Sequence, residues 1–392
     1  MWKRILIAAG VLVIVAAVVI AYFLATRSPE VNVLAKPGEL RWKAKLGNSA
    51  YGANALNDVV VAYRFSIWGF GKRKVHAYDA ATGKRLWAKM SANSAGGLTP
   101  DVVSLPAGAL VVFPNYEHPR QAFDLRTGEV WLEFPEAVPP VYGAFAIDSD
   151  RLCIYGNSSG LAFSGADSIA AFSLTRNALE WTYGPGNIIS QVVSDGTRVY
   201  FGALSGGPKF TAVNLADGKE AWSVSTGNEM AFHAAAGDAA VCYSRPTGSG
   251  LHVFDAATGM EKWALPPPTM YYSPVIAGGR LYVGDIGGCH AYSIADGNEI
   301  WAYAWPWPSR YASLSVRGGS VYCATMGALV VLDADTGKER WRFQVEGMVA
   351  WRPAMSGDTV YFTTDKGWLY AVAIEPEGQN VVPQTDTVKT LR

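Results

Sequence analysis

The sequence predicts an all-β fold: an eight-bladed β-propeller with four antiparallel strands in each blade, preceded by an N-terminal transmembrane helix. Three observations support this prediction. A turn of the form Asp-x-x-Thr-Gly, followed by a strand that carries a Trp, recurs along the chain. Its copies are about 40 to 50 residues apart, which is the period of propeller blades. The chain also begins with a long uncharged segment, which is typical of a membrane span.

The repeat is clearest in residues 76–87, 252–263 and 331–341. In the first copy, Asp79 is able to accept hydrogen bonds from its own turn, and Gly83 supplies the positive φ that reverses the chain. Apolar runs flank the turn, so each copy is expected to be a β-hairpin. We expect each tryptophan to pack against the next blade. These blade-docking tryptophans are Trp42, Trp87, Trp131, Trp181, Trp222, Trp263, Trp301 and Trp341.

The ring is expected to close by joining the two ends of the propeller sequence. We name the strands of a blade A to D from the axis outward. After Trp341 the chain provides A, B and C strands near residues 349–355, 360–363 and 368–374, but no D strand. Residues 38–44 form a D strand without a preceding A to C. Joined together they complete an eighth blade, which leaves no open sheet edge in the ring.

The domain organisation follows from these assignments: a membrane anchor at 1–26, a linker at 27–37, the propeller at 38–376 and a polar tail at 377–392. Residues 5–25 carry no charge and are long enough, at about 1.5 Å per residue, for the roughly 30 Å hydrocarbon core. Lys3 and Arg4 favour a cytoplasmic N-terminus, with the propeller on the periplasmic or extracellular side of the cytoplasmic membrane. A cleaved signal peptide is the less favoured alternative, because the apolar run is long and no small-x-small site follows it.

The composition excludes some classes of function. The formal net charge is +0 and the pI is about 7.0, so the sequence shows no basic footprint for nucleic acid. The four cysteines fall in predicted strands, where no two are obvious partners and no Cys-x-x-Cys pair occurs. We therefore expect them to be buried free thiols. They are Cys153, Cys242, Cys289 and Cys323.

One face of the disc is predicted to be the binding face. The A–B and C–D connections share a face and are short, so we call it the tight-turn face. The B–C and D–A connections share the opposite face, the loop face, and are expected to be long and individual. Irregular loops on a rigid scaffold commonly carry function.

Several predicted A strands begin on the loop face with an aromatic residue or an arginine. Together they would form a funnel at the channel mouth, suited to an anionic or aromatic ligand or an acidic peptide. The alternative is that these aromatics only pack between neighbouring blades. The insert around Trp68 and Phe70 could instead touch lipid headgroups. The candidate binding residues are Tyr51, Trp68, Phe70, Arg73, His118, Tyr142, Tyr272, Trp305, Trp307, Arg310, Tyr311, Trp351 and Arg352.

The unit Ala77-x-Asp79-x-x-Thr82-Gly83-x-x-x-Trp87 resembles the tryptophan-docking repeat of the quinoprotein (PQQ-type) eight-bladed propellers, most nearly their non-enzymatic, BamB-like members. The resemblance covers nearly everything after Lys36. In the enzymatic members it implies PQQ on the axis beside a disulfide of adjacent cysteines, a calcium or lanthanide ion and an Asp base. This chain has no adjacent cysteines and is shorter, and Asp101 and Asp148 are isolated acids.

We therefore expect no catalytic residues, no PQQ and no metal. The expected function is that of a membrane-anchored extracytoplasmic scaffold or envelope assembly factor, whose partner is an envelope protein or a membrane complex. No Cys lies near the end of the apolar segment, so lipoprotein processing is not expected. Two alternatives remain: a PQQ- or metal-dependent dehydrogenase, and a sensor that binds a small ligand at the channel mouth. A chromophore with bound metal would indicate the first, and a ligand-induced thermal shift the second.

Overall fold

The structure is a computed structural model. It describes residues 32, 35–50, 52–65, 73–91, 101–106, 108–112, 120–138, 141–156, 168–184, 186, 188, 192–203, 207–226, 230–236, 239–244, 250–265, 272–307, 309 and 312–375. The regular elements in these ranges are all β-strands, as the sequence predicts. Within the same ranges no helix has the length and apolar character needed to cross a membrane. The predicted membrane anchor at residues 5–25 and the tail at 377–392 lie outside the described residues.

Six four-stranded antiparallel sheets, blades 1 to 6, follow one another along the described chain. The strands of blades 1 to 3 are β2 (Gly52–Leu56), β3 (Val59–Phe65), β4 (Arg73–Asp79), β5 (Arg85–Ser91), β6 (Asp101–Leu105), β7 (Gly108–Val112), β8 (Gln121–Asp124), β9 (Val130–Glu133), β10 (Val141–Ala146), β11 (Arg151–Gly156), β12 (Ser168–Ser173) and β13 (Ala178–Tyr183). Those of blades 4 to 6 are β14 (Val193–Ser194), β15 (Arg198–Ala203), β16 (Lys209–Asn214), β17 (Glu220–Ser225), β18 (Met230–Ala236), β19 (Ala239–Ser244), β20 (Leu251–Asp255), β21 (Glu261–Leu265), β22 (Tyr272–Ala277), β23 (Arg280–Gly284), β24 (Gly288–Ser293) and β25 (Glu299–Ala304).

A seven-stranded sheet completes the described fold, in the order β1-β31-β30-β29-β28-β27-β26. Its strands are β1 (Leu40–Lys45), β26 (Ser313–Arg317), β27 (Ser320–Ala324), β28 (Met326–Asp333), β29 (Glu339–Ser356), β30 (Thr359–Thr364) and β31 (Trp368–Ala373). The long strand β29 pairs with β28 through its first part and with β30 through its second part. We refer to the β26 half of this sheet as blade 7 and to the β31 half as blade 8.

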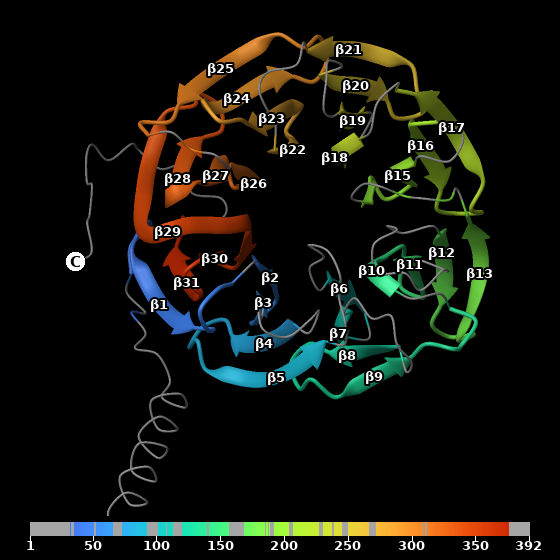
Figure 1. Ribbon diagram of the computed structural model, residues 1–392, viewed down its shortest axis with the longest axis horizontal. Coiled ribbons are helices and arrows are strands. Elements are labelled where there is room, and N and C mark those ends of the chain that lie inside the picture. Colours follow the sequence, from blue (N-terminus) through green and yellow to red (C-terminus); the bar gives the residue numbers. More distant parts are fainter. Residues whose placement is uncertain are drawn as a thin grey trace, which may run out of the picture.

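The N-terminal strand closes the ring. Strand β1 pairs antiparallel with β31, with Trp42 opposite Ala371 and Lys45 opposite Trp368. This pairing confirms the predicted union of the N-terminal D strand with three C-terminal strands. Figure 1 shows the sheets arranged as a ring around a central opening, with β1 beside β31 and the first strand of each blade innermost. The apolar core lies between neighbouring sheets: one cluster joins Val61 and Val75 of blade 1 to Val111 of blade 2.

The repeated turns have the predicted local geometry. The Asp79 carboxylate accepts hydrogen bonds from the amide and the hydroxyl of Thr82, at 2.9 and 2.7 Å, and Gly83 has a φ of 64°. Asp255 and Asp333 accept the same pair of bonds in their own turns. The turn is therefore set by contacts within a few residues, which explains why it can be identified from sequence.

In the described residues, six of the eight repeat tryptophans dock on the turn of the following blade through one contact. The indole N–H donates to a backbone carbonyl of that turn. The carbonyl belongs to the residue directly after the Asp, Asn or Ser with which the turn begins. The donor–acceptor pairs are Trp42–Ala80 (2.9 Å), Trp87–Leu125 (3.0 Å), Trp181–Leu215 (3.2 Å), Trp222–Ala256 (2.9 Å), Trp263–Ile294 (3.0 Å) and Trp301–Ala334 (3.0 Å).

Trp131 and Trp341 depart from this pattern. Trp131 is 38% exposed, and in the corresponding turn of the next blade Asn177, with a φ of 49°, stands in place of the glycine. Trp341 packs against Gly38, but its buried indole N–H has no hydrogen-bond partner among the described residues. In blade 8 the C and D strands come from opposite ends of the propeller sequence, so no continuous turn presents a carbonyl to Trp341.

Candidate functional site

The described part of the loop face is built mainly from blades 6, 7 and 8. Their B–C connections are short, which makes the expectation of long, individual loops wrong for these three blades. In blade 6 the connection is residues 285–287, where the Asp285 carboxylate accepts the amides of Gly287 and Gly288 at 2.6 and 2.7 Å. Thr325 alone connects β27 to β28, and residues 365–367 connect β30 to β31. The B–C inserts of blades 1 to 3 fall outside the described residues.

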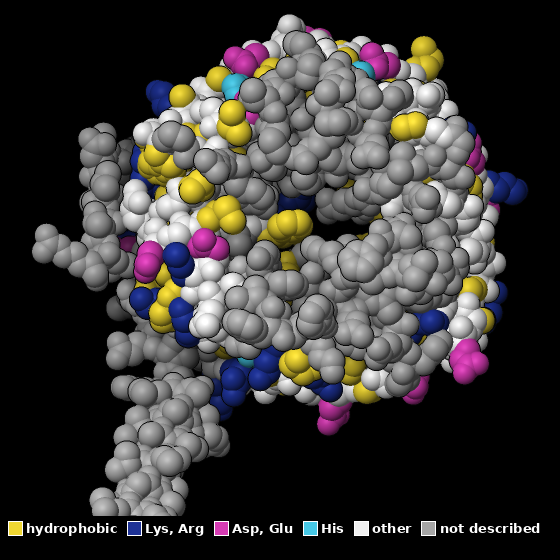
Figure 2. Space-filling view, in the orientation of Figure 1, with side chains coloured by type: hydrophobic (Ala, Val, Ile, Leu, Met, Phe, Trp, Pro, Cys, Tyr) yellow, Lys and Arg dark blue, Asp and Glu magenta, His cyan; other side chains and the backbone are white. Residues whose placement is uncertain are grey.

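Three large apolar side chains are exposed on this surface: Ile286 is 41% exposed, Met326 39% and Trp351 41%. We call them the apolar strip. They belong to blades 6, 7 and 8. Met326 pairs with Met348 of β29, the strand that also carries Trp351. The other exposed large apolar side chains in the described ranges lie on outer strands or in a C–D turn: Met90, Val130, Trp131, Met260 and Ile300. Figure 2 shows hydrophobic side chains reaching the central opening from the side of β26 and β29.

The D–A connection between blades 6 and 7 is hydrogen-bonded to the two turns that carry Ile286 and Met326. The Trp305 amide donates to the Gly287 carbonyl at 2.9 Å, and the Ser309 hydroxyl accepts the Met326 amide at 3.3 Å. The D–A connection of blades 6 and 7 therefore runs between the two turns and fixes their spacing.

Trp351 is held in a strained conformation. The register between β29 and β30 shifts between Ala350 and Ala354, which marks a β-bulge at Trp351 and Arg352. Trp351 has a φ of 71°, a left-handed value that bulky residues seldom adopt. The bulge is anchored behind it, where the carbonyl of buried Pro353 accepts the Ser315 hydroxyl at 2.6 Å. Bulges re-aim side chains, and strained residues of this kind gather at functional sites.

Similar bulges occur near the start of three other A strands. The register shifts between Val141 and Gly143 in β10, between Met230 and Phe232 in β18, and between Tyr272 and Val275 in β22. The candidate residue Tyr142 lies in the first of these bulges, and Tyr272 begins the last. Four of the predicted binding residues therefore lie at irregularities of inner strands: Tyr142, Tyr272, Trp351 and Arg352. Of these four, the structure describes the side chains of Trp351 and Arg352 only.

A cluster of lysines borders the apolar strip on blade 8. The ammonium groups of Lys43 and Lys45 lie over the Trp368 ring, at 5.0 and 4.7 Å from its centroid. Lys45 also donates to the Lys366 carbonyl at 2.7 Å. All three lysines are exposed. We call Lys43, Lys45 and Lys366 the lysine cluster. Sequence reasoning missed it, although lysines at alternating positions of an edge strand were a visible signal.

Two predicted candidates in the D–A connection of blades 6 and 7 have different environments. Trp305 is only 8% exposed, belongs to the core between these blades and donates to the Asp285 carbonyl at 3.0 Å. Its assignment as a surface-binding residue is therefore corrected: it is a packing residue. Trp307 is half-buried, and the Arg342 guanidinium lies over its ring, with Cζ 5.1 Å from the ring centroid. Arg342 in turn donates a hydrogen bond to the Glu339 carboxylate.

The remaining predicted candidates cannot be placed. Arg73 begins β4, but its side chain is not described. The others lie outside the described residues: Tyr51, Trp68, Phe70, His118, Arg310 and Tyr311.

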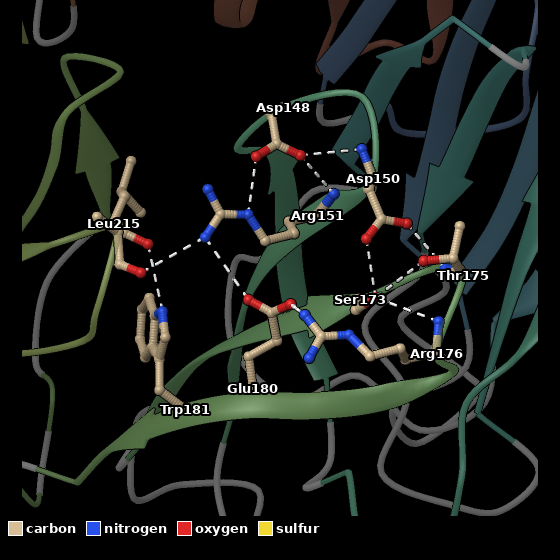
Figure 3. A network of polar contacts seen from close by, with 10 residues as sticks. Asp148, Asp150, Arg151, Ser173, Thr175, Arg176, Glu180, Trp181 and Leu215 are labelled. Atoms are coloured by element: carbon tan, nitrogen blue, oxygen red, sulfur yellow. Dashed lines mark hydrogen bonds and ion pairs between the residues drawn. The ribbon is translucent and has the colours of Figure 1, made fainter.

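Polar contacts on the tight-turn face join blade 3 to blade 4. Figure 3 shows Arg151 between Asp148 and Glu180. Arg151 Nη1 also lies 3.5 Å from the carbonyl oxygen of Ala216 in blade 4. The Asp150 amide and the Arg151 side chain hold the pKa of the Asp148 carboxyl below its ordinary value. Asp148 is thus engaged in fixing the turn. In the part of the chain that the structure describes, no three His, Cys, Asp or Glu side chains are placed to hold a metal ion.

A shallow pocket of about 430 Å³ also lies on the tight-turn face, between blades 7, 8 and 1. Its walls come from the ends of three inner strands and include Leu56 of β2, Val316 and Arg317 of β26, and Met355 of β29. It is on the opposite side of the disc from the apolar strip.

His290 on blade 6 lies near two carboxylates, and this arrangement gives a prediction for how stability depends on pH. His290 Nε2 lies 3.5 Å from Asp285, and Nδ1 lies 3.2 Å from Glu299. Asp285, and after it Glu299, raise the pKa of His290 against the opposing effect of burial. Burial acts to raise the pKa of Asp285, but His290 and the amides of Gly287 and Gly288 together lower it.

The pKa of His290 is higher in the folded protein than in the unfolded chain, where it is about 6.5. The ion pairs of His290 therefore stabilise the fold fully below pH 6.5, and this stabilisation is lost as the pH rises through the pKa of the folded state. Asp285 stays ionised across this range. We expect His290→Gln to lower the free energy of unfolding more at about pH 5.5 than at about pH 9.5, as measured by urea denaturation. His252→Gln, at the same repeat position, controls for loss of the ring. A difference that stays constant with pH would contradict this assignment.

Comparisons with known proteins support the same architecture. A family model described as outer membrane protein assembly factor BamB matches residues 2–224, 165–316 and 287–378. The crystal structure of the computationally designed Ika8 protein is similar at a TM-score of 0.65 and 13% identity, covering 89% of this chain and 100% of that one. The crystal structure of BamB from Moraxella catarrhalis is similar at a TM-score of 0.59 and 16% identity, covering 86% and 99%. A search of curated proteins gives no match. The matches of the family model span most of the chain, and the protein therefore belongs to the BamB family of PQQ-type repeat propellers.

Proposed function

We propose that this protein is a membrane-anchored extracytoplasmic scaffold that binds another protein of the cell envelope through its loop face. The observation that carries the proposal is the apolar strip of Ile286, Met326 and Trp351 beside the lysine cluster. An apolar centre with a polar, charged margin is the usual composition of a protein–protein interface. Trp351 is exposed and the adjacent Arg352 is partly buried, and tryptophan and arginine are residue types that most often dominate binding energy.

The chemistry of this surface defines the kind of partner. Lys43, Lys45 and Lys366 supply positive charge on the outer side of blade 8, and Arg352 supplies it near the channel mouth. A partner segment with aliphatic or aromatic side chains flanked by Asp or Glu would match both features. The charges would steer the encounter, and the apolar contacts would supply most of the affinity.

Family membership supports an assembly role. The family model is described as an outer membrane protein assembly factor. Proteins that assemble complexes need a rigid surface that holds a partner, and the ring of sheets supplies one. We propose that the protein works without PQQ and without catalysis, on the ground that its sequence has no adjacent cysteines to flank the cofactor.

We further propose that the ring has eight blades and that residues 5–25 anchor it in the cytoplasmic membrane with the N-terminus inside. The two parts of β29 pair with different neighbours, which supports counting the seven-stranded sheet as two blades. Strand β1 begins on the tight-turn face, where Arg41 pairs with Asp358 of an A–B turn at 2.5 Å. The anchor would then leave from the face opposite the apolar strip, which directs the strip away from the membrane.

A small-ligand function has one observation in its favour. The pocket between blades 7, 8 and 1 has a volume within the range of small-molecule sites and combines apolar walls with Arg317. A ligand-induced rise in melting temperature that Arg317→Ala abolishes would support this second function.

The test of the scaffold function is capture of a partner by the full-length protein from envelopes solubilised in mild detergent, with mass spectrometry and an absorbance spectrum of the eluate. We expect a stoichiometric envelope protein and no quinone absorbance. The double variant Trp351→Ala, Arg352→Ala should reduce recovery of that partner about tenfold or more, because both residues lie at the centre of the proposed interface.

Met260→Ala with Arg126→Ala is the matched control, since both residues are exposed on the tight-turn face. This control should recover the partner normally. Equal recovery by the loop-face variant and the wild type would contradict the proposed site. A bound quinone without a protein partner would contradict the scaffold function itself.

A further inference from the structure

Two of the four cysteines lie at the same blade interface in the folded protein. Cys289 begins the C strand of blade 6 and Cys323 lies in the B strand of blade 7, and both are fully buried in one core cluster between these blades. Burial, and after it the neighbouring Cys289, raise the pKa of the Cys323 thiol. All four cysteines are buried free thiols in the structure, as the sequence predicts. The sequence did not show that two of them share one blade interface. Cys153 and Cys242 belong to two other clusters and to other blade interfaces.

The two blades approach unusually closely at this point. Gly284 is the strand partner of Cys289, and a Cβ added to it would lie 2.8 Å from the Ala312 Cβ and 2.9 Å from the Ala312 carbonyl oxygen. Ala312 lies two residues before Leu314, the strand partner of Cys323. Only a glycine and an alanine lie at this contact, so the two blades come close together beside the strand that carries Cys289. A disulfide needs this kind of approach, because its Cα atoms are about 4.4 to 6.8 Å apart.

We propose that Cys289 and Cys323 form a disulfide that joins blades 6 and 7 when the protein folds under oxidising conditions. The co-reactant is a disulfide oxidant such as glutathione disulfide. One cysteine thiolate attacks it and releases one glutathione thiol, which leaves a mixed disulfide. The second cysteine attacks the mixed disulfide and releases the second thiol. Two thiols are thus oxidised to one disulfide, and the oxidant is reduced to two thiols.

The timing of this reaction follows from the burial of the pair. Burial raises the pKa of the Cys323 thiol well above its ordinary value, so the folded protein holds little of the thiolate that attacks a disulfide. The bridge therefore forms while the chain folds, before blades 6 and 7 close over the pair. Once formed, it is shielded from soluble reductants by the same packing. The inference does not depend on the proposed scaffold function.

The test is cell-free synthesis of the full-length protein into mild detergent, in parallel glutathione buffers that are oxidising or reducing. Free thiols are blocked with an alkylating reagent during denaturation, and the folded, soluble fraction is digested and analysed by mass spectrometry. In the oxidising buffer we expect a cross-linked peptide pair containing Cys289 and Cys323, with Cys153 and Cys242 alkylated. The cross-link should disappear on reduction.

A second readout tests whether the bridge belongs to the native structure. The bridge closes a loop of moderate length, so the oxidised protein should melt about 5 °C or more above the reduced protein. The double variant Cys289→Ala, Cys323→Ala should show no such redox-dependent difference, whereas Cys153→Ala, Cys242→Ala should keep it. Alkylation of all four cysteines in the oxidised folded fraction would overturn the proposal. So would a cross-link that lowers the melting temperature.

Discussion

Replacing Gly218 by Ala is expected to lower the free energy of unfolding by about 2 to 4 kcal/mol. Gly218 lies in the C–D turn of blade 4, with a φ of 70°, directly beneath the Trp181 ring. A Cβ at this position would lie 2.5 Å from Cδ2 and 2.6 Å from Cε3 of that ring. The indole would have to move away, which would also disturb its hydrogen bond to the Leu215 carbonyl. Urea denaturation followed by tryptophan fluorescence measures the change.

Gly279→Ala is the matched control. Gly279 has a φ of 71°, nearly the same as Gly218, but an added Cβ would meet no atom within 4 Å. The control carries only the backbone penalty of a side chain at positive φ, about 1 kcal/mol. The difference between the two variants isolates the contact with tryptophan. If both variants lose the same stability, the glycine serves the turn alone and has no role in docking the tryptophan.

Replacing Trp301 by Ala is expected to cost about 3 to 5 kcal/mol, the range for deleting a large buried aromatic side chain. Trp301 is buried in the cluster between blades 6 and 7, and its indole donates to the Ala334 carbonyl at 3.0 Å. The substitution would leave a cavity at a blade interface and remove one donor to the Ala334 carbonyl, which also accepts from Tyr282 and Arg280. Thermal and urea denaturation of the full-length protein in detergent measure the loss.

Trp131→Ala tests the same repeat position where docking is incomplete. Because Trp131 is 38% exposed and the corresponding turn of the next blade has Asn177 in place of glycine, we expect a loss of only about 1 kcal/mol. Equal losses at the two positions would show that exposure of Trp131 does not reflect weaker docking. The comparison therefore tests whether one glycine per turn decides how tightly neighbouring blades join.

The parts of the candidate site that were foreseen are those at the start of inner strands. Trp351 and Arg352 were predicted at the start of an inner strand, and the structure places them in a bulge of β29, while their role in binding stays a prediction. The neighbouring Trp305 was wrongly assigned to the surface, because sequence does not distinguish it from Trp307 two residues later. Only the packing of blade 6 on blade 7 decides that Trp305 is buried and bonded to the Asp285 carbonyl.

The lysine cluster shows why other parts were missed. Lys45 and Lys366 are far apart in the sequence, and ring closure through β1 and β31 brings them together around Trp368. The placement of Cys289 and Cys323 in one core cluster has the same origin, because that cluster forms between two blades. Neither arrangement has a local signature.

The sequence by itself determined the all-β propeller architecture, the turns and the closure by an N-terminal strand. These features depend on hydrogen bonds within a few residues, such as those of Asp79 with Thr82, and on a period that repeats along the chain. Tertiary structure alone decided which tryptophans are fully docked, which apolar side chains stay exposed and which cysteines share a blade interface. Those outcomes depend on the distance between neighbouring sheets, which is set by side chains and backbone from different blades at once.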